Sequence, residues 1–130
     1  MIGLDTTAII DFFKEDKSLK KILDQNEETL ASTIINHQEI MFGLDITDKK
    51  HMGEKVDYNQ FFEELVLFPH SIKSSTKSAE IFWQLKKKGM EIGKLDCMIA
   101  GILLANGVNK IITRKVGHFK TIKDLEVISY

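Results

Sequence analysis

The sequence predicts an α/β protein in which helices cover both faces of a mostly parallel central sheet, giving three layers, α/β/α. Short apolar runs typical of buried strands alternate along the chain with longer segments that have helical spacing. Strands separated by helices imply a mostly parallel sheet. The length of 130 residues suits one domain, spanning residues 1–130.

The first half of the chain begins with a short buried strand over residues 1–5. The run TAIIDFFKED then places apolar residues at helical spacing, and a second short helix follows near residues 19–23. Residues 29–33 form the next strand pattern. After it, INHQEIMFGLDI again has helical spacing, and a polar region around residues 48–53 separates it from another helix near residues 58–65.

The second half of the chain continues the alternation. The run LVLFPH supplies a strand that Pro69 ends. Ser74 or Ser75 can cap a long helix that stops at Gly89, after three lysines that suit the negative end of a helix dipole. We expect Asp96 to start the next helix, which ends at an Asn-Gly pair, and the runs NKIIT and EVISY to be strands.

The composition is that of a globular protein. Hydrophobic residues make up 43% of the chain and charged residues 28%, and no apolar run approaches the ~18 residues that suggest a membrane span. The start, MIGLDTTAIIDFF, has no basic leader and no small-residue cleavage site, which predicts a cytoplasmic protein without a membrane partner. The single cysteine, Cys97, excludes an internal disulfide and a multi-cysteine zinc site, and we expect it to pack in the core.

Charge is unevenly distributed along the chain, although the net charge is only −1. Residues 84–123 hold nine basic side chains against two acidic ones, a balance of +7, which leaves −8 for the remainder. The basic residues are Lys86, Lys87, Lys88, Lys94, Lys110, Arg114, Lys115, Lys120 and Lys123. Such asymmetry can attract a polyanion, whereas solvated lysines on helix faces are the more ordinary interpretation.

Acidic side chains occur where a parallel sheet builds its ligand crevice, near the carboxyl ends of its strands. Asp5 ends the first strand, Glu39 lies about one turn into the helix after the second strand, and Asp96 opens a later helix. Thr113 ends the strand NKIIT. Clustered carboxylates repel one another, a cost that a hard dication removes. Oxygen ligands without a Cys or His cluster favour Mg²⁺ or Mn²⁺ over zinc.

Each of these acids also has an ordinary structural interpretation. Asp5 can be a turn residue at a strand end, Glu39 a solvated helix glutamate, and Asp96 an N-cap worth about 1 kcal/mol to its helix. Thr113 alone indicates little. The hypothesis of a metal site therefore depends on whether these distant residues converge in space.

Four segments, taken in order, carry a resemblance to a known family. They are LDTTAIIDFF near the start, the glutamate in INHQEIMFGL, the run GKLDCMIAGILLANG, and IITRKVGHFKTIKDLEVISY at the end. Together they resemble a PIN domain of the VapC-like toxin type over essentially the whole chain. The resemblance implies a PIN-like parallel sheet, a metal-dependent endoribonuclease with an acidic Mg²⁺ or Mn²⁺ site, a VapB-like antitoxin as partner, and a homodimer.

The resemblance also implies roles for individual residues. Asp5, Glu39 and Asp96 match the acidic metal site, and Thr113 matches a polar residue that hydrogen-bonds near it. The sequence departs from the family pattern two residues later, where Lys115 stands in place of an aspartate or asparagine. As an ammonium, Lys115 cannot bind a metal. It either partly neutralises the acids, so that the site works with a single metal, or marks a site that has decayed into an RNA-binding surface.

The expected reaction is hydrolysis of an RNA phosphodiester bond. Bound metal would lower the pKa of a coordinated water and neutralise charge that builds on the phosphate oxygens. Asp5 and Asp96 would hold the cation most directly. Glu39 would complete its shell or orient the attacking water.

The basic and aromatic residues have separate interpretations. Lys94, Arg114 and Lys115 are expected to draw in the RNA backbone, which contributes affinity but little sequence choice. We expect His118 to be a structural, hydrogen-bonding histidine rather than a general acid. Six aromatic residues in apolar helical patterns are expected to pack in the core or in a dimer interface: Phe12, Phe13, Phe61, Phe62, Phe82 and Trp83.

Two other functions fit parts of the pattern. A degenerate PIN domain could act as a non-catalytic RNA-binding or scaffold module. A signalling receiver is also a parallel α/β protein, but it needs a phospho-accepting aspartate after a middle strand, where this chain has Asn36 and His37. An apolar surface on the first helices would suit a second subunit or an antitoxin segment.

Overall fold

The computed structural model of the chain describes residues 1–130. Its strands are β1 (Ile2–Leu4), β2 (Leu30–Thr33), β3 (Val66–Phe68), β4 (Lys110–Ile112) and β5 (Glu126–Ile128). Its α-helices are α1 (Thr6–Phe13), α2 (Lys17–Gln25), α3 (Ile34–Gly43), α4 (Met52–Glu64), α5 (Ile72–Lys87), α6 (Lys94–Ala105) and α7 (Val116–Phe119), and a short 3-10 helix, η1 (Lys49–His51), precedes α4. This alternation confirms the predicted fold class.

The central sheet is parallel throughout, with the strand order β3-β2-β1-β4-β5. Its middle strand is β1, in which Gly3 aligns with Ala31 of β2 on one side and with Ile111 of β4 on the other. The chain moves outward from β1 through β2 to β3, and then returns to the opposite side of β1. The strand order therefore reverses between β1 and β4, which is where a ligand crevice is expected at the carboxyl ends of the strands.

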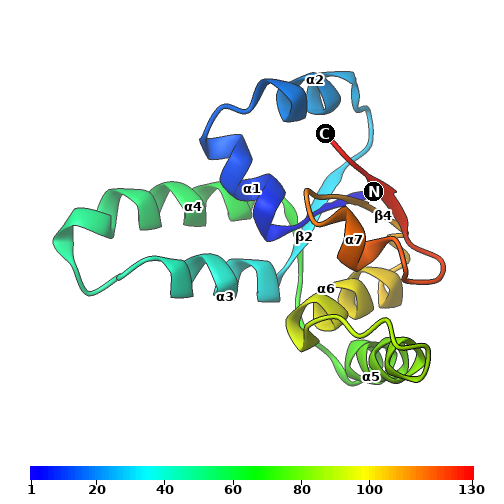
Figure 1. Cartoon of the computed structure of the whole chain (residues 1–130). Helices are drawn as coiled ribbons and strands as arrows, with labels where there is room; N and C mark the ends of the chain where they lie inside the picture. The colour runs from blue at the N-terminus through cyan, green and yellow to red at the C-terminus, as the bar shows by residue number, and fades with distance from the viewer.

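Two hydrophobic clusters hold helices against the two faces of the sheet. One joins α5 and α6 to β4 and to the C-terminal segment, with Leu103 and Ile111 fully buried. The other joins β1 to α1, α2, α3 and α4, with Leu4 and Ile9 fully buried. Figure 1 shows this layering, with α1 and α2 above the sheet and α5 and α6 below it.

Helices α3 and α4 form a hairpin that projects away from the sheet (Figure 1). The two helices are joined by a hydrogen bond of 2.7 Å between His37 Nε2 and Asn59 Oδ1, and the His37 ring packs edge-on against Phe62, with centroids 5.0 Å apart. No helix of the chain combines the length and the apolar character that a membrane crossing requires.

Two local predictions about helix starts are wrong, and one short helix was not predicted. Ser71 caps α5, and Ser74 is its reciprocal partner in a capping box, so the helix begins earlier than Ser74 or Ser75 would allow. Helix α6 begins at Lys94, which makes Asp96 its third residue and not its cap. The short helix α7 lies in a segment where no helix was predicted, because four residues are too few to show a helical period.

Six aromatic residues were predicted to pack in the core or in a dimer interface. Only some of them lie in the core. Phe62 is buried, at 2% exposure, and Cys97 is buried as predicted. Phe12, Phe13 and Trp83 are 43%, 36% and 54% exposed and do not belong to the core. Helical spacing places such residues on one face of a helix but does not reveal whether another element covers that face.

Candidate active site

Asp5 lies at the carboxyl end of β1 and caps helix α1. Its Oδ1 accepts hydrogen bonds from the backbone N–H of Ala8 at 3.0 Å and from Thr7 Oγ1 at 2.7 Å, and its Oδ2 accepts one from Thr113 Oγ1 at 2.7 Å. The residue is only 1% exposed. This burial raises the pKa of Asp5 above its ordinary value, although the hydrogen bonds and the positive charge of Lys115 act in the opposite direction.

Thr113 reaches Asp5 because β4 pairs directly with β1, with Ile112 opposite Leu4. Two further hydrogen bonds fix the turn that follows β4. Thr7 Oγ1 accepts the backbone N–H of Arg114 at 3.0 Å, and Thr113 Oγ1 accepts that of Lys115 at 2.8 Å. The Asp-Thr-Thr turn after β1 therefore holds the Thr-Arg-Lys turn after β4.

Glu39 approaches from helix α3, which follows the neighbouring strand β2. Its Oε1 accepts a hydrogen bond of 2.6 Å from Thr6 Oγ1, and Thr6 Oγ1 in turn accepts one of 3.1 Å from Asn36 Nδ2. Asn36 is fully buried and also forms a capping box with Thr33 at the start of α3. This chain of contacts orients the half-buried glutamate toward the start of α1.

Asp96 lies in the first turn of α6, where the positive end of the helix dipole favours an anion. Its side chain is 7% exposed, and both carboxylate oxygens have partners from the segment after β4. Oδ1 lies 3.3 Å from Lys115 Nζ, and Oδ2 lies 2.6 Å from His118 Nδ1. The segment after β4 is thus held at both ends, by Thr7 on α1 and by Asp96 on α6.

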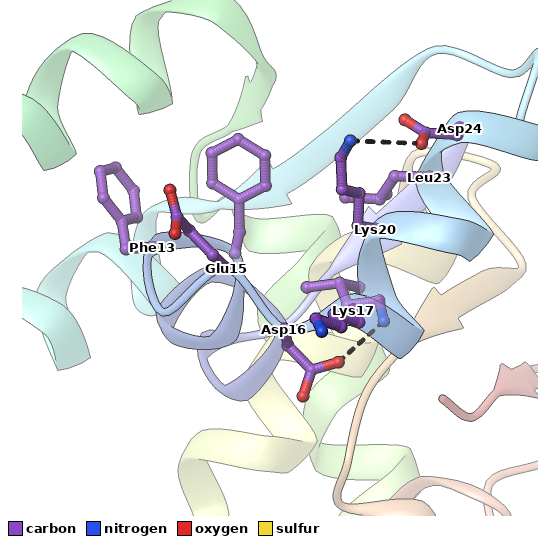
Figure 2. Close-up of a pocket in the computed structure, with 9 residues that line it drawn as sticks. Phe13, Glu15, Asp16, Lys17, Lys20, Leu23 and Asp24 are labelled. Carbon is purple, nitrogen blue, oxygen red and sulfur yellow. Dashed lines mark hydrogen bonds and ion pairs between the residues drawn. The ribbon is translucent and has the colours of Figure 1, made fainter.

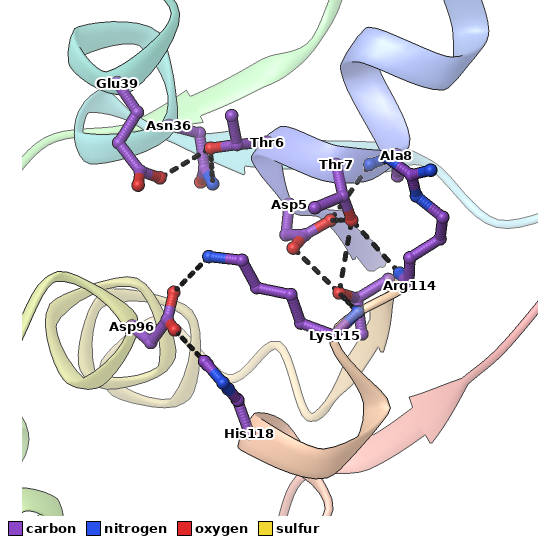
Figure 3. A network of polar contacts seen from close by, with 11 residues as sticks. Asp5, Thr6, Thr7, Ala8, Asn36, Glu39, Asp96, Arg114, Lys115 and His118 are labelled. Carbon is purple, nitrogen blue, oxygen red and sulfur yellow. Dashed lines mark hydrogen bonds and ion pairs between the residues drawn. The ribbon is translucent and has the colours of Figure 1, made fainter. Parts of the chain in front are cut away.

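Figure 3 shows Asp5, Glu39 and Asp96 directed toward one space between α1, α3 and α6, with the Lys115 side chain extended into it. No three Asp, Glu, His or Cys side chains lie close enough together to hold one metal ion. The three acids face a common space without forming a closed ligand shell, and the cation among them is the Lys115 ammonium.

The three basic residues predicted to bind RNA lie in different places. Lys115 extends among the acids. Arg114 extends toward α1 (Figure 3). Its Nε lies 2.7 Å from Oδ2 of the buried Asp11. Lys94 lies over α5, with its Nζ 5.8 Å from the centroid of the Phe82 ring.

Comparison with protein families identifies the family to which this fold belongs. The family described as PIN domain matches residues 2–121. This chain belongs to the PIN domain family. A comparison with curated proteins finds no match.

Solved structures resemble this PIN domain along its whole length. VapBC2 from Rickettsia felis, bound to a DNA fragment from its promoter, has a TM-score of 0.85 at 25% identity, covering 100% of this chain and 99% of that one. FitAB bound to a DNA fragment has a TM-score of 0.83 at 25% identity, covering 99% and 94%. DNA-bound VapBC from Salmonella typhimurium has a TM-score of 0.85 at 19% identity, covering 98% and 96%.

PIN domains are generally nucleases and typically use divalent metals. The donors that this PIN domain offers are carboxylate oxygens, which suit a hard dication. Each oxygen can accept a hydrogen bond and still offer a lone pair to an ion. The positions of the side chains suit a metal ion less well than their chemistry does. The Lys115 ammonium pairs with Asp96, and an ion would have to displace it.

Sequence reasoning missed the residues that hold the acids in this PIN domain. Thr6 and Asn36 orient Glu39, and Thr7 links Asp5 to the turn after β4. The two threonines directly after Asp5 in LDTT were a usable signal, because hydroxyls beside a carboxylate at a strand end can donate to it. Nothing in the sequence pointed to Asn36, which was considered only as the residue that argued against a receiver.

Proposed function

We propose that this PIN domain is the toxin of a toxin-antitoxin pair, an endoribonuclease that hydrolyses RNA phosphodiester bonds with Mg²⁺ or Mn²⁺. The observation that carries the proposal is the approach of Asp5, Glu39 and Asp96, from three separate elements, to one space at the carboxyl ends of β1 and β4. The whole-chain similarity to VapBC2 and FitAB supports it.

In this proposal the three acids have different roles. Asp5 and Asp96 would hold the cation, and Glu39 would complete its shell or orient the attacking water. The metal, when bound, supplies a coordinated water of lowered pKa and a charge opposite to that of the phosphate. Thr113 is the hydroxyl that fixes the orientation of Asp5, from 2.7 Å away. Because Asp5 is already held in place by such a neighbour, it would not have to reorient during the reaction.

Lys115 takes a second role in the same proposal. Its ammonium is 3.3 Å from Asp96 Oδ1, and its side chain is 35% exposed, so it lies between the buried acid and the solvent. When an ion takes its place on Asp96, the ammonium can hold an oxygen of the scissile phosphate. This arrangement favours a single metal, because the position that an acid or amide would fill carries a positive charge.

The alternative is a degenerate PIN domain that binds RNA or acts as a scaffold without cleaving. The ion pair between Lys115 and Asp96 favours it, since both charges are satisfied without a metal. So does the lack of three acids close enough to hold one ion. The two functions differ in whether a divalent metal changes what the protein does to RNA.

Incubating the purified chain with a mixed RNA pool tests the nuclease proposal. Fragments are expected with Mg²⁺ or Mn²⁺ and not with EDTA. Asp96→Asn is expected to lower the rate by at least about 100-fold, because a ligand of the reacting ion is lost. Asp24→Asn, at an exposed aspartate on α2, is the matched control and is expected to cleave as the wild type does.

Two results would count against a nuclease. Absence of cleavage under any divalent metal, by a chain that circular dichroism shows to be folded, favours the non-catalytic module. Equal cleavage by the wild type and Asp96→Asn would point to a contaminating ribonuclease.

A VapB-like antitoxin is the proposed protein partner, and the first two helices offer a place for it. A pocket of 610 Å³ lies between α1 and α2, and Figure 2 shows the residues that line it. Its apolar lining comes from Phe12, Phe13, Leu19 and Leu23, and charged residues, among them Lys17, Lys20 and Asp24, surround it. A hydrophobic floor with charges of both signs around it suits an amphipathic peptide segment.

The remaining proposals concern assembly and location. We expect a homodimer, as the resemblance to VapC-like toxins implies, and a location in the cytoplasm. Light scattering coupled to size exclusion measures the mass directly and compares it with 14.9 kDa for one chain.

A further inference from the structure

A cluster of aromatic rings and ammonium groups lies where the end of α5 meets the start of α6. Trp83 is 54% exposed, and its ring packs edge-on against Phe82, with centroids 5.4 Å apart. Lys86 Nζ lies 5.0 Å from the Trp83 centroid and 5.6 Å from that of Phe82. Lys94 Nζ lies 5.8 Å from the Phe82 centroid, so two elements contribute a cation to the same pair of rings.

The cluster borders an open pocket of 340 Å³ between α5 and α6. Phe82, Trp83 and Lys94 line it, and Cys97 and Met98 of α6 contribute to its lining. Neither Lys86 nor Lys94 forms an ion pair, in contrast to Lys115, which pairs with Asp96. Unpaired ammonium groups beside an exposed aromatic face are the features that proteins use to hold the phosphates and bases of a single strand.

The pocket and the candidate active site share the start of α6 but lie on different sides of it. Lys94 and Asp96 both belong to the first turn of α6, two residues apart, which corresponds to a rise of about 3 Å along the helix. Asp96 faces Lys115 and His118, whereas Lys94 faces α5. Residues two positions apart in a helix do not share a face, so a strand that reaches both would pass around the N-terminal end of α6.

A second copy of this chain is the other candidate partner that could cover the exposed Trp83 ring. Residues 84–94 contain four lysines and one glutamate. A symmetric contact on this face would bring two such lysine groups together, which is unfavourable. The charge suits a polyanion better, and an exposed indole adds a surface on which a base can stack.

We propose that Phe82, Trp83, Lys86 and Lys94 form a binding subsite for single-stranded RNA, here called the α5–α6 subsite. A base stacks on the exposed Trp83 ring, and the Lys86 and Lys94 ammonium groups bind the phosphates on either side. The subsite rests on the proposed ribonuclease function and deepens it, because it supplies the surface that holds the strand entering the acidic site.

The test uses Trp83 as its own probe, because it is the only tryptophan in the chain. A single-stranded RNA oligonucleotide of mixed sequence is titrated into the full-length protein in EDTA, so that binding is measured without metal-dependent cleavage. Tryptophan fluorescence is expected to be quenched as the RNA saturates, and a duplex of the same sequence is expected to leave it unchanged. Anisotropy of the labelled oligonucleotide gives the affinity in parallel.

Variants distinguish binding at the subsite from non-specific electrostatic attraction of RNA to the protein. Trp83→Ala is expected to weaken binding on the order of tenfold, the effect of losing one stacked base. Lys86→Gln and Lys94→Gln are each expected to weaken it and to reduce the dependence on salt. Lys73→Gln, at an exposed lysine in the first turn of α5, is the matched control and is expected to bind as the wild type does.

Three results would overturn the subsite. One is RNA binding without any change in Trp83 fluorescence and with unchanged affinity in Trp83→Ala. Another is no RNA binding even at low salt. The third is a shift from dimer to monomer in Trp83→Ala, with fluorescence that follows protein concentration and not RNA, which would show that a second copy covers this face. None of them depends on cleavage, so the nuclease proposal succeeds or fails separately, through Asp96→Asn.

Discussion

At the scale of single residues, the candidate site is built from buried charges. Asp5 is 1% exposed and accepts hydrogen bonds only from neutral donors, and burial raises its pKa. Below the unfolded-state value of 3.8 the carboxyl is protonated in both states. As the pH rises through the higher folded-state pKa, the folded state must ionise a buried acid, so the free energy of unfolding falls.

Asp5→Asn removes this ionisation and keeps the shape of the side chain. In EDTA at pH 7 the variant is expected to be more stable than the wild type by about 1 kcal/mol, as is common when a strained functional residue is replaced. At pH 3 the difference is expected to vanish. Urea unfolding at the two pH values measures the difference in free energy of unfolding between the variant and the wild type. A difference that favours the wild type more at pH 7 than at pH 3 would contradict this account of Asp5.

Lys115 provides a second test at this scale, one that measures metal binding and not activity. Its ammonium competes with a dication for Asp96, and Lys115→Met removes the charge while keeping the length. The affinity for Mn²⁺, measured by calorimetry or by electron paramagnetic resonance, is expected to rise on the order of tenfold, from the loss of one repulsive charge a few ångströms away. An unchanged or weaker affinity would mean that no ion is held beside Lys115.

At the scale of elements, the close packing of α5 on α6 depends on one glycine. A Cβ on Gly101 would lie 2.8 Å from the backbone nitrogen of Ser78 and 2.9 Å from its Cα, so the two helices approach too closely for any larger residue. The contact supports both neighbouring sites, because α6 carries Asp96 and α5 carries Trp83.

Gly101→Ala is accordingly expected to destabilise the protein by about 2 kcal/mol, the usual cost of forcing an extra carbon into a packed interface. Gly53 is the matched control, since it lies in α4 with nothing within 4 Å of an added Cβ. Gly53→Ala is expected to raise the stability by up to about 1 kcal/mol through helix propensity. Thermal melts of both variants provide the comparison, and similar effects of the two would refute the role of the helix contact.

Elements were also the scale at which sequence reasoning worked best. The alternation of apolar runs identified all five strands, because a buried parallel strand is a short continuous apolar segment. The N-cap preference for Ser and Asp placed the starts of α5 and α6 incorrectly, because several serines or acids near a helix start satisfy it. The contacts of Asp96 with Lys115 and His118 span 19 and 22 residues of sequence, and no local pattern encodes them.

At the scale of the whole molecule, the exposed pocket between α1 and α2 makes a prediction about the partner. Phe12 is 43% exposed and lines it. Phe12→Ala is expected to weaken binding of a VapB-like antitoxin, the proposed partner, by about 2 kcal/mol, as for a buried aromatic anchor. Phe42→Ala is the control, because Phe42 is 81% exposed on α3 and does not line the pocket. Calorimetry with the purified antitoxin measures both, and equal losses would exclude the pocket as the docking place.

The pairing of β1 with β4 determines when the acidic site can exist at all. Thr113 donates its hydrogen bond to Asp5 across 108 residues, and β4 is the strand that brings them together. During synthesis, Asp5 is made 108 residues before Thr113 and remains without this neighbour until β4 has been made. A product of interrupted translation that ends before Lys110 contains Asp5, Glu39 and Asp96 but lacks β4, so the hydroxyl that fixes Asp5 is missing and the acidic site stays unassembled.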